Sequence, residues 1–358
     1  MWPAVCHASA HAQRGSHGRS LLFLRVSMMD GRVYLAIDGT ASAFGDAEPL
    51  IICGDNVLLG RSSADPQRHR ILRTRLWGAG HFDDLDQAIA RAPAKTLCVG
   101  LSPQPNAVLM LGQVCAIAIA RGLEVEVVEL GAAVPGSPGG VDPGRGMPVD
   151  YVALAGHLPP AARWSKLEMA LAATLWRLWC RHSPVAFSRF CTMGATLHPL
   201  LADLQRYQAG HFPRVGPRGW LLSRVDELLL RQVSHEWSTP VRVFVKAVTE
   251  DPCLYAWLLH LGDLYVVARL LAWSRHSQGQ IVERRREHPA APAPMMNWSF
   301  RWHPGGERVL EALPSLDTAP PVAIGGSDAY DAEHPWVCQV GPAGPYVTTG
   351  RRSARRDA

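Results

Sequence analysis

The chain has 358 residues, 47% of them hydrophobic, and a formal net charge of +5. The length suggests two or three domains, and the hydrophobic content is ample for packed cores, which excludes wholesale disorder. The mild basic excess falls well short of that of a dedicated nucleic-acid binder. No apolar run reaches the roughly 18 residues that a membrane-spanning helix needs, so we expect no membrane partner.

The sequence predicts an N-terminal extension followed by an α/β domain. Residues 1–30 are expected to be a disordered extension, with a natural start at Met28 or Met29. Apolar runs that alternate with helical patterns over residues 31–130 predict a small parallel sheet with helices on its faces. The expected strands are Val33–Ile37, Leu50–Cys53, Thr96–Gly100 and Glu124–Glu129, and the expected helices are Pro66–Trp77, Asp83–Ala92 and Ala107–Arg121.

The second half of the chain is predicted to be mainly helical. Residues 131–150 are rich in Gly and Pro, which indicates a linker. Residues 151–215 are expected to form a helical connector, residues 216–345 a winged-helix-like domain, and residues 346–358 a basic tail. The expected helices begin at Ser165, Pro184, Leu197, Ser223, Thr239 and Leu264, and a short one covers Glu307–Leu313.

The winged-helix expectation depends on element order. Two strand-like stretches, Gln280–Glu287 and Asn297–Trp302, follow the last three long helices. Three helices followed by a two-stranded wing is the order of a winged helix. The third of these helices is apolar, with only Arg269 and Arg275 as nearby cations, so we expect it to be buried rather than to read a DNA groove.

Eight cysteines occur without any Cys-x-x-Cys pair. Cys53, Cys98 and Cys115 lie inside apolar patterns, which is typical of small buried residues in a reducing compartment and not of disulfides or zinc ligands. We therefore expect a cytoplasmic protein. The sequence predicts no metal site and identifies no cofactor.

The loop Ser102–Asn106 lies where an α/β sheet binds its ligands, outside the carboxyl end of a strand. It reads Ser-Pro-Gln-Pro-Asn and has no acid, His, Lys or Gly-rich phosphate cradle. The P-loop, Rossmann, Gly-x-Ser-x-Gly and His-Glu-x-x-His motifs are also absent from the sequence. These absences favour binding over catalysis.

A small polar ligand has one candidate site, formed by Asp38, Thr40, Asp55 and Gly60. Asp38 and Thr40 follow the first expected strand, and Asp55 follows the second. If these strands are neighbours, the two carboxylates could approach each other and act as an acid–base pair or bind a metal. The alternative is that Asp55 caps its turn by bonding to backbone amides.

A nucleic acid also has one candidate site, the basic wing. Arg284, Arg285 and Arg286 are consecutive, and Arg301 lies on the expected opposing strand. Such a cluster can contact phosphates without reading sequence. The alternative is a solvated basic edge that discourages pairing with other strands.

Several landmarks together carry a family resemblance. They are Asp55 with Gly60, Leu109–Leu111, Leu261–Asp263, Glu307–Leu310, Ile324–Gly326 and Trp336. In this order they resemble the bacterial domain-of-unknown-function 1835 family. The resemblance implies an N-terminal α/β domain, a helical middle and a winged-helix-like C-terminal domain, but no established activity. The chain departs from the family at Pro103 and Ala107, where the family pattern has polar residues.

Taken together, the sequence predicts a non-catalytic binding or regulatory protein. One alternative is an enzyme that acts on a nucleotide or small polar ligand at the strand ends of the α/β domain. The other is nonspecific nucleic-acid binding through the basic wing.

Overall fold

The computed structural model separates the chain into two compact units, Met1–Cys180 and Arg181–Ala358, which are described in turn. The boundary lies inside the predicted connector 151–215. No helix in the described part of the chain is long and apolar enough to cross a membrane. The structure describes residues 31–37, 50–53, 55–58, 60–77, 84–92, 94–102, 104–130, 160–194, 199–217, 219–250, 265–288, 297–342 and 344–350.

A mainly parallel sheet forms the centre of the first unit. Its strand order is β2-β1-β4-β5-β6, in which the first four strands are parallel and β6 is antiparallel to β5. The mixed α/β class with parallel strands is therefore confirmed. The strands are β1 (Arg32–Ile37), β2 (Leu50–Cys53), β4 (Thr96–Leu101), β5 (Glu124–Glu129) and β6 (Ala162–Arg163), and the short β3 (Gly60–Arg61) lies outside this sheet.

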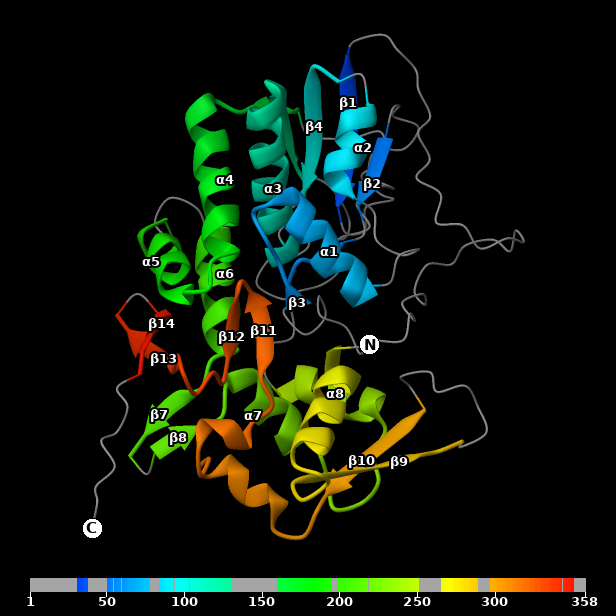
Figure 1. Cartoon of the computed structure of the whole chain (residues 1–358), viewed down its shortest axis with the longest axis vertical. Coiled ribbons are helices and arrows are strands. Elements are labelled where there is room, and N and C mark those ends of the chain that lie inside the picture. Colours follow the sequence, from blue (N-terminus) through cyan, green and yellow to red (C-terminus); the bar gives the residue numbers. More distant parts are fainter. Residues whose placement is uncertain are drawn as a thin grey trace, which may run out of the picture. The chain divides into compact units, whose positions relative to one another are not determined.

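Three of the four helices described in the first unit, α1, α2 and α4, begin at polar caps that the sequence provides. Asp65 accepts a hydrogen bond from the backbone of Arg68, and Ser165 forms a capping box with Glu168. Helix α3 packs against β4 and β5 on one side and against α4 on the other (Figure 1). The helices are α1 (Pro66–Trp77), α2 (Leu85–Arg91), α3 (Pro105–Arg121) and α4 (Lys166–Trp179).

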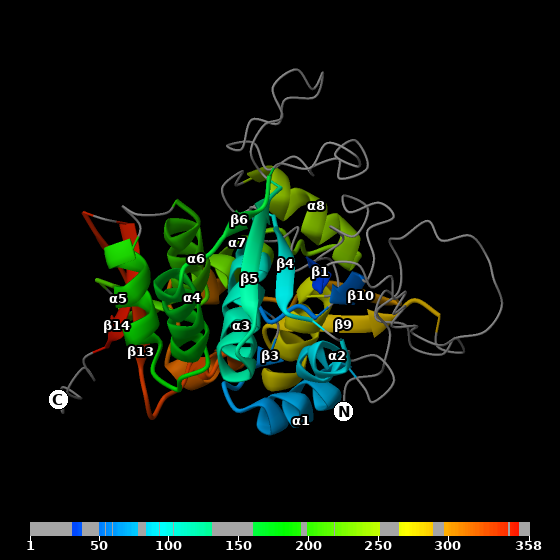
Figure 2. The same ribbon diagram turned by 90° about the horizontal axis from the view of Figure 1, so that it is seen from above.

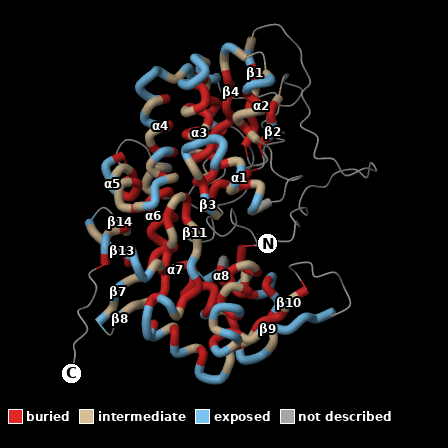
Figure 3. The backbone as a smooth tube through the Cα atoms, in the orientation of Figure 1, coloured by how far each residue is buried: buried red, intermediate tan, exposed pale blue. Residues whose placement is uncertain are grey.

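The core of the first unit lies between the sheet and α3. Leu35, Leu97 and Val99 are fully buried on the strands, and Leu109 and Val114 are fully buried on α3. Figure 3 shows α3 and β4 largely in the buried colour. The cysteines predicted to be buried, Cys53, Cys98 and Cys115, are confirmed as buried free thiols.

The second unit begins with helices and continues in short strands. The helices are α5 (Pro184–Gly194), α6 (Pro199–Gly210), α7 (Arg224–Arg231), α8 (Pro240–Glu250) and a further helical stretch over 265–276. The strands are β7 (Arg214–Gly216), β8 (Gly219–Leu221), β9 (Val282–Arg286), β10 (Trp298–Trp302), β11 (Val322–Gly325), β12 (Ser327–Ala329), β13 (Trp336–Gly341) and β14 (Gly344–Thr349).

Three strand groups organise these elements. One sheet has the order β14-β13-β7-β8, while β9 pairs with β10 and β11 with β12. Helix α5 lies beside the β13–β14 hairpin, as Figure 2 shows from above. The isolated bridge between Ser238 and Phe300 attaches the segment before α8 to β10.

The expectation of a mainly helical second half is corrected by these strands. The C-terminal region consists mostly of strands, and the expected helix Glu307–Leu313 is a 3-10 helix over Gly306–Leu310. The strands are only three to six residues long. Segments this short show no clear period-2 pattern, and glycine turns such as Gly341–Gly344 separate them.

Candidate functional site

The predicted acid site is described only in part. Asp38 and Thr40 lie outside the described residues. Asp55 follows β2 and is 6% exposed, and its carboxylate faces Arg73 of α1. Arg73 Nε donates to the two carboxylate oxygens at 2.9 and 3.0 Å, and its Nη2 donates to Oδ1 as well. His69 Nε2 lies 3.7 Å from Oδ2.

Asp55 is therefore held as an anion. Burial alone would raise the pKa of Asp55, but the charge of Arg73 and hydrogen bonds from His69 and Arg73 outweigh it, so the pKa lies below its ordinary value. A general base must exchange protons near neutral pH. This carboxylate instead attaches β2 to α1, which differs from both the catalytic role and the turn cap considered from the sequence.

Asn106, at the end of the Ser102–Asn106 loop, supports the turn that contains Asp55 and Val57. Asn106, in the first turn of α3, donates through Nδ2 to the carbonyl of Asp55 at 3.1 Å. Its Oδ1 accepts from the backbone of Val57 at 2.9 Å. Gly60 has a φ of +71°, a conformation that favours glycine. Asp55 and Gly60, the described members of the predicted ligand site, thus have roles in holding the local fold.

The basic wing is an antiparallel ribbon in which arginines alternate between two faces. Trp298 of β10 pairs with Arg286 of β9, and Arg301 pairs with Glu283. Because neighbouring side chains of a strand point to opposite faces, Arg284 and Arg286 share one face, and Arg285 lies on the other. Figure 3 shows β9 running out into the exposed colour.

Each face of the ribbon carries a tryptophan covered by two guanidinium groups. Arg284 and Arg286 lie over the ring of Trp298, at 5.3 and 5.6 Å from its centroid. On the other face, Arg285 and Arg301 each lie 4.6 Å from the centre of Trp237. These distances are those of cation–π interactions. We name this group of four arginines and two tryptophans the Arg–Trp ribbon.

The two faces of the Arg–Trp ribbon differ in charge compensation. On the Trp237 face, Arg301 pairs with Glu283 at 2.7 Å, and Arg285 pairs with Glu287 at 3.2 Å. On the Trp298 face, Arg284 forms no ion pair within the described part of the chain. Burial and the nearby charge of Arg275 lower the pKa of Arg284.

The sequence predicted the four arginines of the ribbon but not their aromatic partners. Trp237 and Trp298 are both partly exposed. Trp298, Phe300 and Trp302 occupy every second position of β10 and share one face, so the strand pattern groups Trp298 with two buried residues. Trp237 immediately precedes the Ser-Thr-Pro start of α8, which places it at the surface.

A buried ion-pair cluster involves the third helix of this region, which the sequence predicted to be buried. Arg269, on the helical stretch 265–276, donates to both oxygens of Asp226 at 2.6 and 2.7 Å. Trp273 Nε1 and the hydroxyl of Tyr330 also donate to this carboxylate, at 3.1 and 2.7 Å. A carboxylate has about four acceptor positions, so Asp226 has no capacity left for a ligand. Arg269 is 3% exposed and cannot reach a phosphate.

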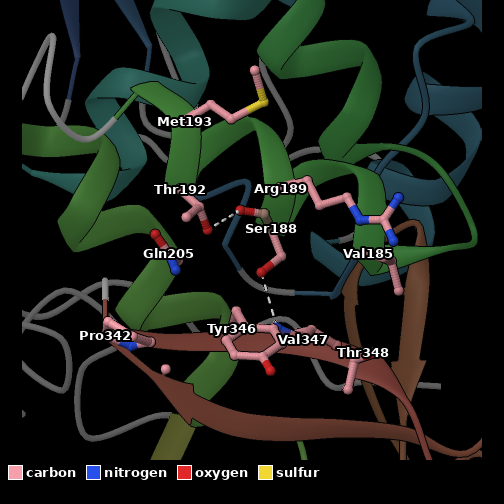
Figure 4. Close-up of a pocket in the computed structure, with 12 residues that line it drawn as sticks. Val185, Ser188, Arg189, Thr192, Met193, Gln205, Pro342, Tyr346, Val347 and Thr348 are labelled. Atoms are coloured by element: carbon pink, nitrogen blue, oxygen red, sulfur yellow. Dashed lines mark hydrogen bonds between the residues drawn. The ribbon is translucent and has the colours of Figure 1, made fainter.

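A cavity of about 370 Å³ lies between α5, α6 and the β13–β14 hairpin (Figure 4). Three of its polar side chains bond to neighbouring groups of the protein. Ser188 accepts from the backbone of Val347 at 2.9 Å, and Thr192 donates to the carbonyl of Ser188 at 2.9 Å. Gln205 donates to the carbonyl of Pro345 at 2.7 Å. The bonds of Ser188 and Gln205 fasten the β13–β14 hairpin to α5 and α6.

No known family model matches the chain, and no curated protein matches it either. The resemblance to the domain-of-unknown-function 1835 family therefore stays a prediction.

Proposed function

We propose that the chain is a cytoplasmic binding protein of the domain-of-unknown-function 1835 type that contacts nucleic-acid phosphates through the Arg–Trp ribbon. The observation that carries the proposal is the stacking of four arginines on Trp237 and Trp298. A stacked guanidinium keeps its charge and its orientation, and its N–H edge stays available for a phosphate oxygen.

The order of elements supports this proposal. Helices α7, α8 and 265–276 are followed by the β9–β10 pair, and the Ser238–Phe300 bridge joins the segment before α8 to that pair. This is the order of a winged helix, with the wing as the exposed element. The third helix is buried, so the proposed contact is with the phosphate backbone and does not depend on base sequence.

A regulatory or assembly role is favoured over catalysis by the described acids. Asp55 and Asp226, both buried, face arginines that occupy their oxygens. Neither carboxylate is available to transfer a proton or to hold a metal. An enzyme would need catalytic groups other than the carboxylates of Asp55 and Asp226.

The proposal predicts a salt-dependent affinity to which Arg284 and Arg286 contribute. We expect labelled duplex and single-stranded probes to bind the full chain at low salt in fluorescence anisotropy, with little sequence preference. The double variant Arg284→Ala/Arg286→Ala should weaken binding and reduce the slope of log K against log salt by about 1–2, since each phosphate contact contributes about 0.9.

The matched control removes the same charge elsewhere. Arg68→Ala/Arg91→Ala takes two exposed arginines from α1 and α2 and should leave the slope unchanged. Arg284→Lys/Arg286→Lys keeps the charge but loses the stacking, and should give an intermediate affinity. Circular dichroism confirms folding of each variant. Absence of binding at low salt, or equal losses in the alanine variant and its control, would contradict the proposal.

A further inference from the structure

Two histidines and one aspartate meet in the second unit, away from the Arg–Trp ribbon in sequence. His182 lies just before α5, while Asp331 and His334 belong to the turn between β12 and β13. Their potential ligand atoms all lie within 4.8 Å of one another. His334 Nδ1 is 3.0 Å from Asp331 Oδ2. No hydrogen bond or ion pair described above depends on these three side chains.

The turn itself holds the carboxylate in place. Asp331 Oδ1 accepts hydrogen bonds from the backbone amides of Glu333 and His334, at 2.8 and 3.1 Å. This closes an Asx-type turn and directs Oδ2 towards the ring of His334. Both the carboxylate and the imidazole are therefore oriented by short-range structure, without help from a bound ion.

Aromatic contacts fix the two imidazole rings. The His334 ring stacks on Trp336, with an interplanar angle of 15° and a centroid distance of 6.1 Å. The ring of His182 meets that of His334 edge-on, with centroids 4.8 Å apart. Trp336 thus plays the supporting part that outer residues play around metal ligands, because it limits the rotation of a coordinating ring.

We propose that His182, Asp331 and His334 bind a divalent transition-metal ion, with zinc as the best match. Imidazole nitrogens suit zinc and its neighbours, whereas calcium and magnesium favour sites made of oxygen alone. Zinc bonds of about 2.0–2.1 Å place tetrahedral ligand atoms roughly 3.3 Å apart. Asp331 and His334 are close to this separation at 3.0 Å, and the ligand atoms of all three residues lie within 4.8 Å of one another.

Three protein ligands leave a fourth position for water or for a group from another molecule. His182 and His334 are exposed and Asp331 is partly exposed, so this position faces solvent. Asp331 and His334 form an Asp-x-x-His pair that is visible in the sequence. The third ligand, His182, joins them only through the fold, and for this reason the sequence predicted no metal site.

The test uses the full chain, freed of metal by a chelator and titrated with Zn²⁺ by calorimetry. We expect one site per chain, a rise in melting temperature, and no competition from Mg²⁺ or Ca²⁺. His182→Ala, Asp331→Asn and His334→Ala should each weaken zinc at least about tenfold. His182→Ala is the decisive variant, because it leaves the Asx-type turn intact.

The control is His235→Ala, which removes an exposed histidine outside the cluster. Its zinc affinity should equal that of the unaltered chain. If His235→Ala weakens binding as much as His182→Ala, the ion binds scattered surface histidines and the proposal fails. It also fails if His182→Ala keeps full affinity. Titration with Co²⁺ provides a second readout, since visible absorption bands report its coordination by the same residues.

Discussion

Tyr330 adopts an unusual backbone conformation that its hydroxyl group explains. Its φ of +62° lies in the left-handed region, which costs a residue other than glycine about 1–2 kcal/mol. The hydroxyl donates to Asp226 at 2.7 Å and accepts from the backbone amide of Ser223 at 2.7 Å. Both bonds are buried, so they offset the strain of the backbone.

The residue-scale prediction is that Tyr330→Phe destabilises the protein by about 1–3 kcal/mol, since it leaves a buried amide and a buried carboxylate oxygen with one partner fewer. Urea unfolding measures the change. The control is Tyr346→Phe, because that hydroxyl bonds to Gln339 at the surface. Its loss should cost less than about 0.5 kcal/mol. Equal costs for the two variants would contradict the account.

At the scale of elements, the close packing of α3 on α4 depends on one glycine. A Cβ atom on Gly112 would lie 2.7 Å from the carbonyl oxygen of Ala172 and 3.1 Å from Cβ of Trp176. Both contacts are shorter than van der Waals distance. The backbones can approach this closely only because position 112 has no side chain.

The variant Gly112→Ala changes the free energy of unfolding through two opposing effects, helix propensity and packing. Helix propensity favours alanine over glycine by about 1 kcal/mol, whereas overpacking costs about 1–3 kcal/mol. We expect packing to win, with a net loss of about 1–2 kcal/mol in urea unfolding. Gly112→Val should lose more. A gain in stability for the alanine variant would show that α3 and α4 can move apart without cost.

The sequence predicted long elements better than short ones. All four strands expected in the α/β domain are present, and their parallel order follows from apolar runs and helical crossovers. Helix starts at Ser165 and Ser223 are confirmed by their side-chain caps. The sheet β14-β13-β7-β8 was not predicted. Its pairing of Cys338 with Arg214 joins segments far apart in the chain, which no local pattern records.

In the candidate sites, too, neighbours in sequence were predicted, whereas partners brought together by the fold were not. The consecutive arginines of β9 were visible because they are neighbours in sequence, and the expected pairing with the strand that carries Arg301 is confirmed. The tryptophans that stack on them, and the histidine that joins Asp331 and His334, depend on the fold. Asp55 was visible as a carboxylate, but its partner Arg73 looked like one of several cations on a basic helix.

At the scale of the whole molecule, acid stability is expected to depend on a buried histidine. His211 is 1% exposed, and its Nδ1 donates to the carbonyl of Tyr207 at 2.9 Å. Burial lowers the pKa of His211 to about 4, from an ordinary value of about 6.5. The folded chain therefore keeps this ring neutral at a pH where the unfolded chain protonates it.

The sign of the pH effect follows from this difference. Between pH 6.5 and 4 the unfolded state binds the extra proton, so stability falls as the pH is lowered through this window and is unaffected above it. From pH 7 to pH 5 the loss should be about 2 kcal/mol. Urea unfolding at both values tests this against His211→Gln, which should lack this part of the loss. An equal loss in both proteins would contradict it.

Tyr330 and Asp331 are consecutive, so the strained residue and a metal ligand share one stretch of backbone. The hydroxyl of Tyr330 fixes that stretch to the amide of Ser223, at the start of α7. An ion bound to the Asp331 carboxylate would favour the backbone conformation that holds it, and so favour the bonds from Tyr330 to Ser223 and Asp226. Such coupling is reciprocal. The buried Asp226–Arg269 ion pair and a metal ion at the surface would therefore stabilise each other without any direct contact.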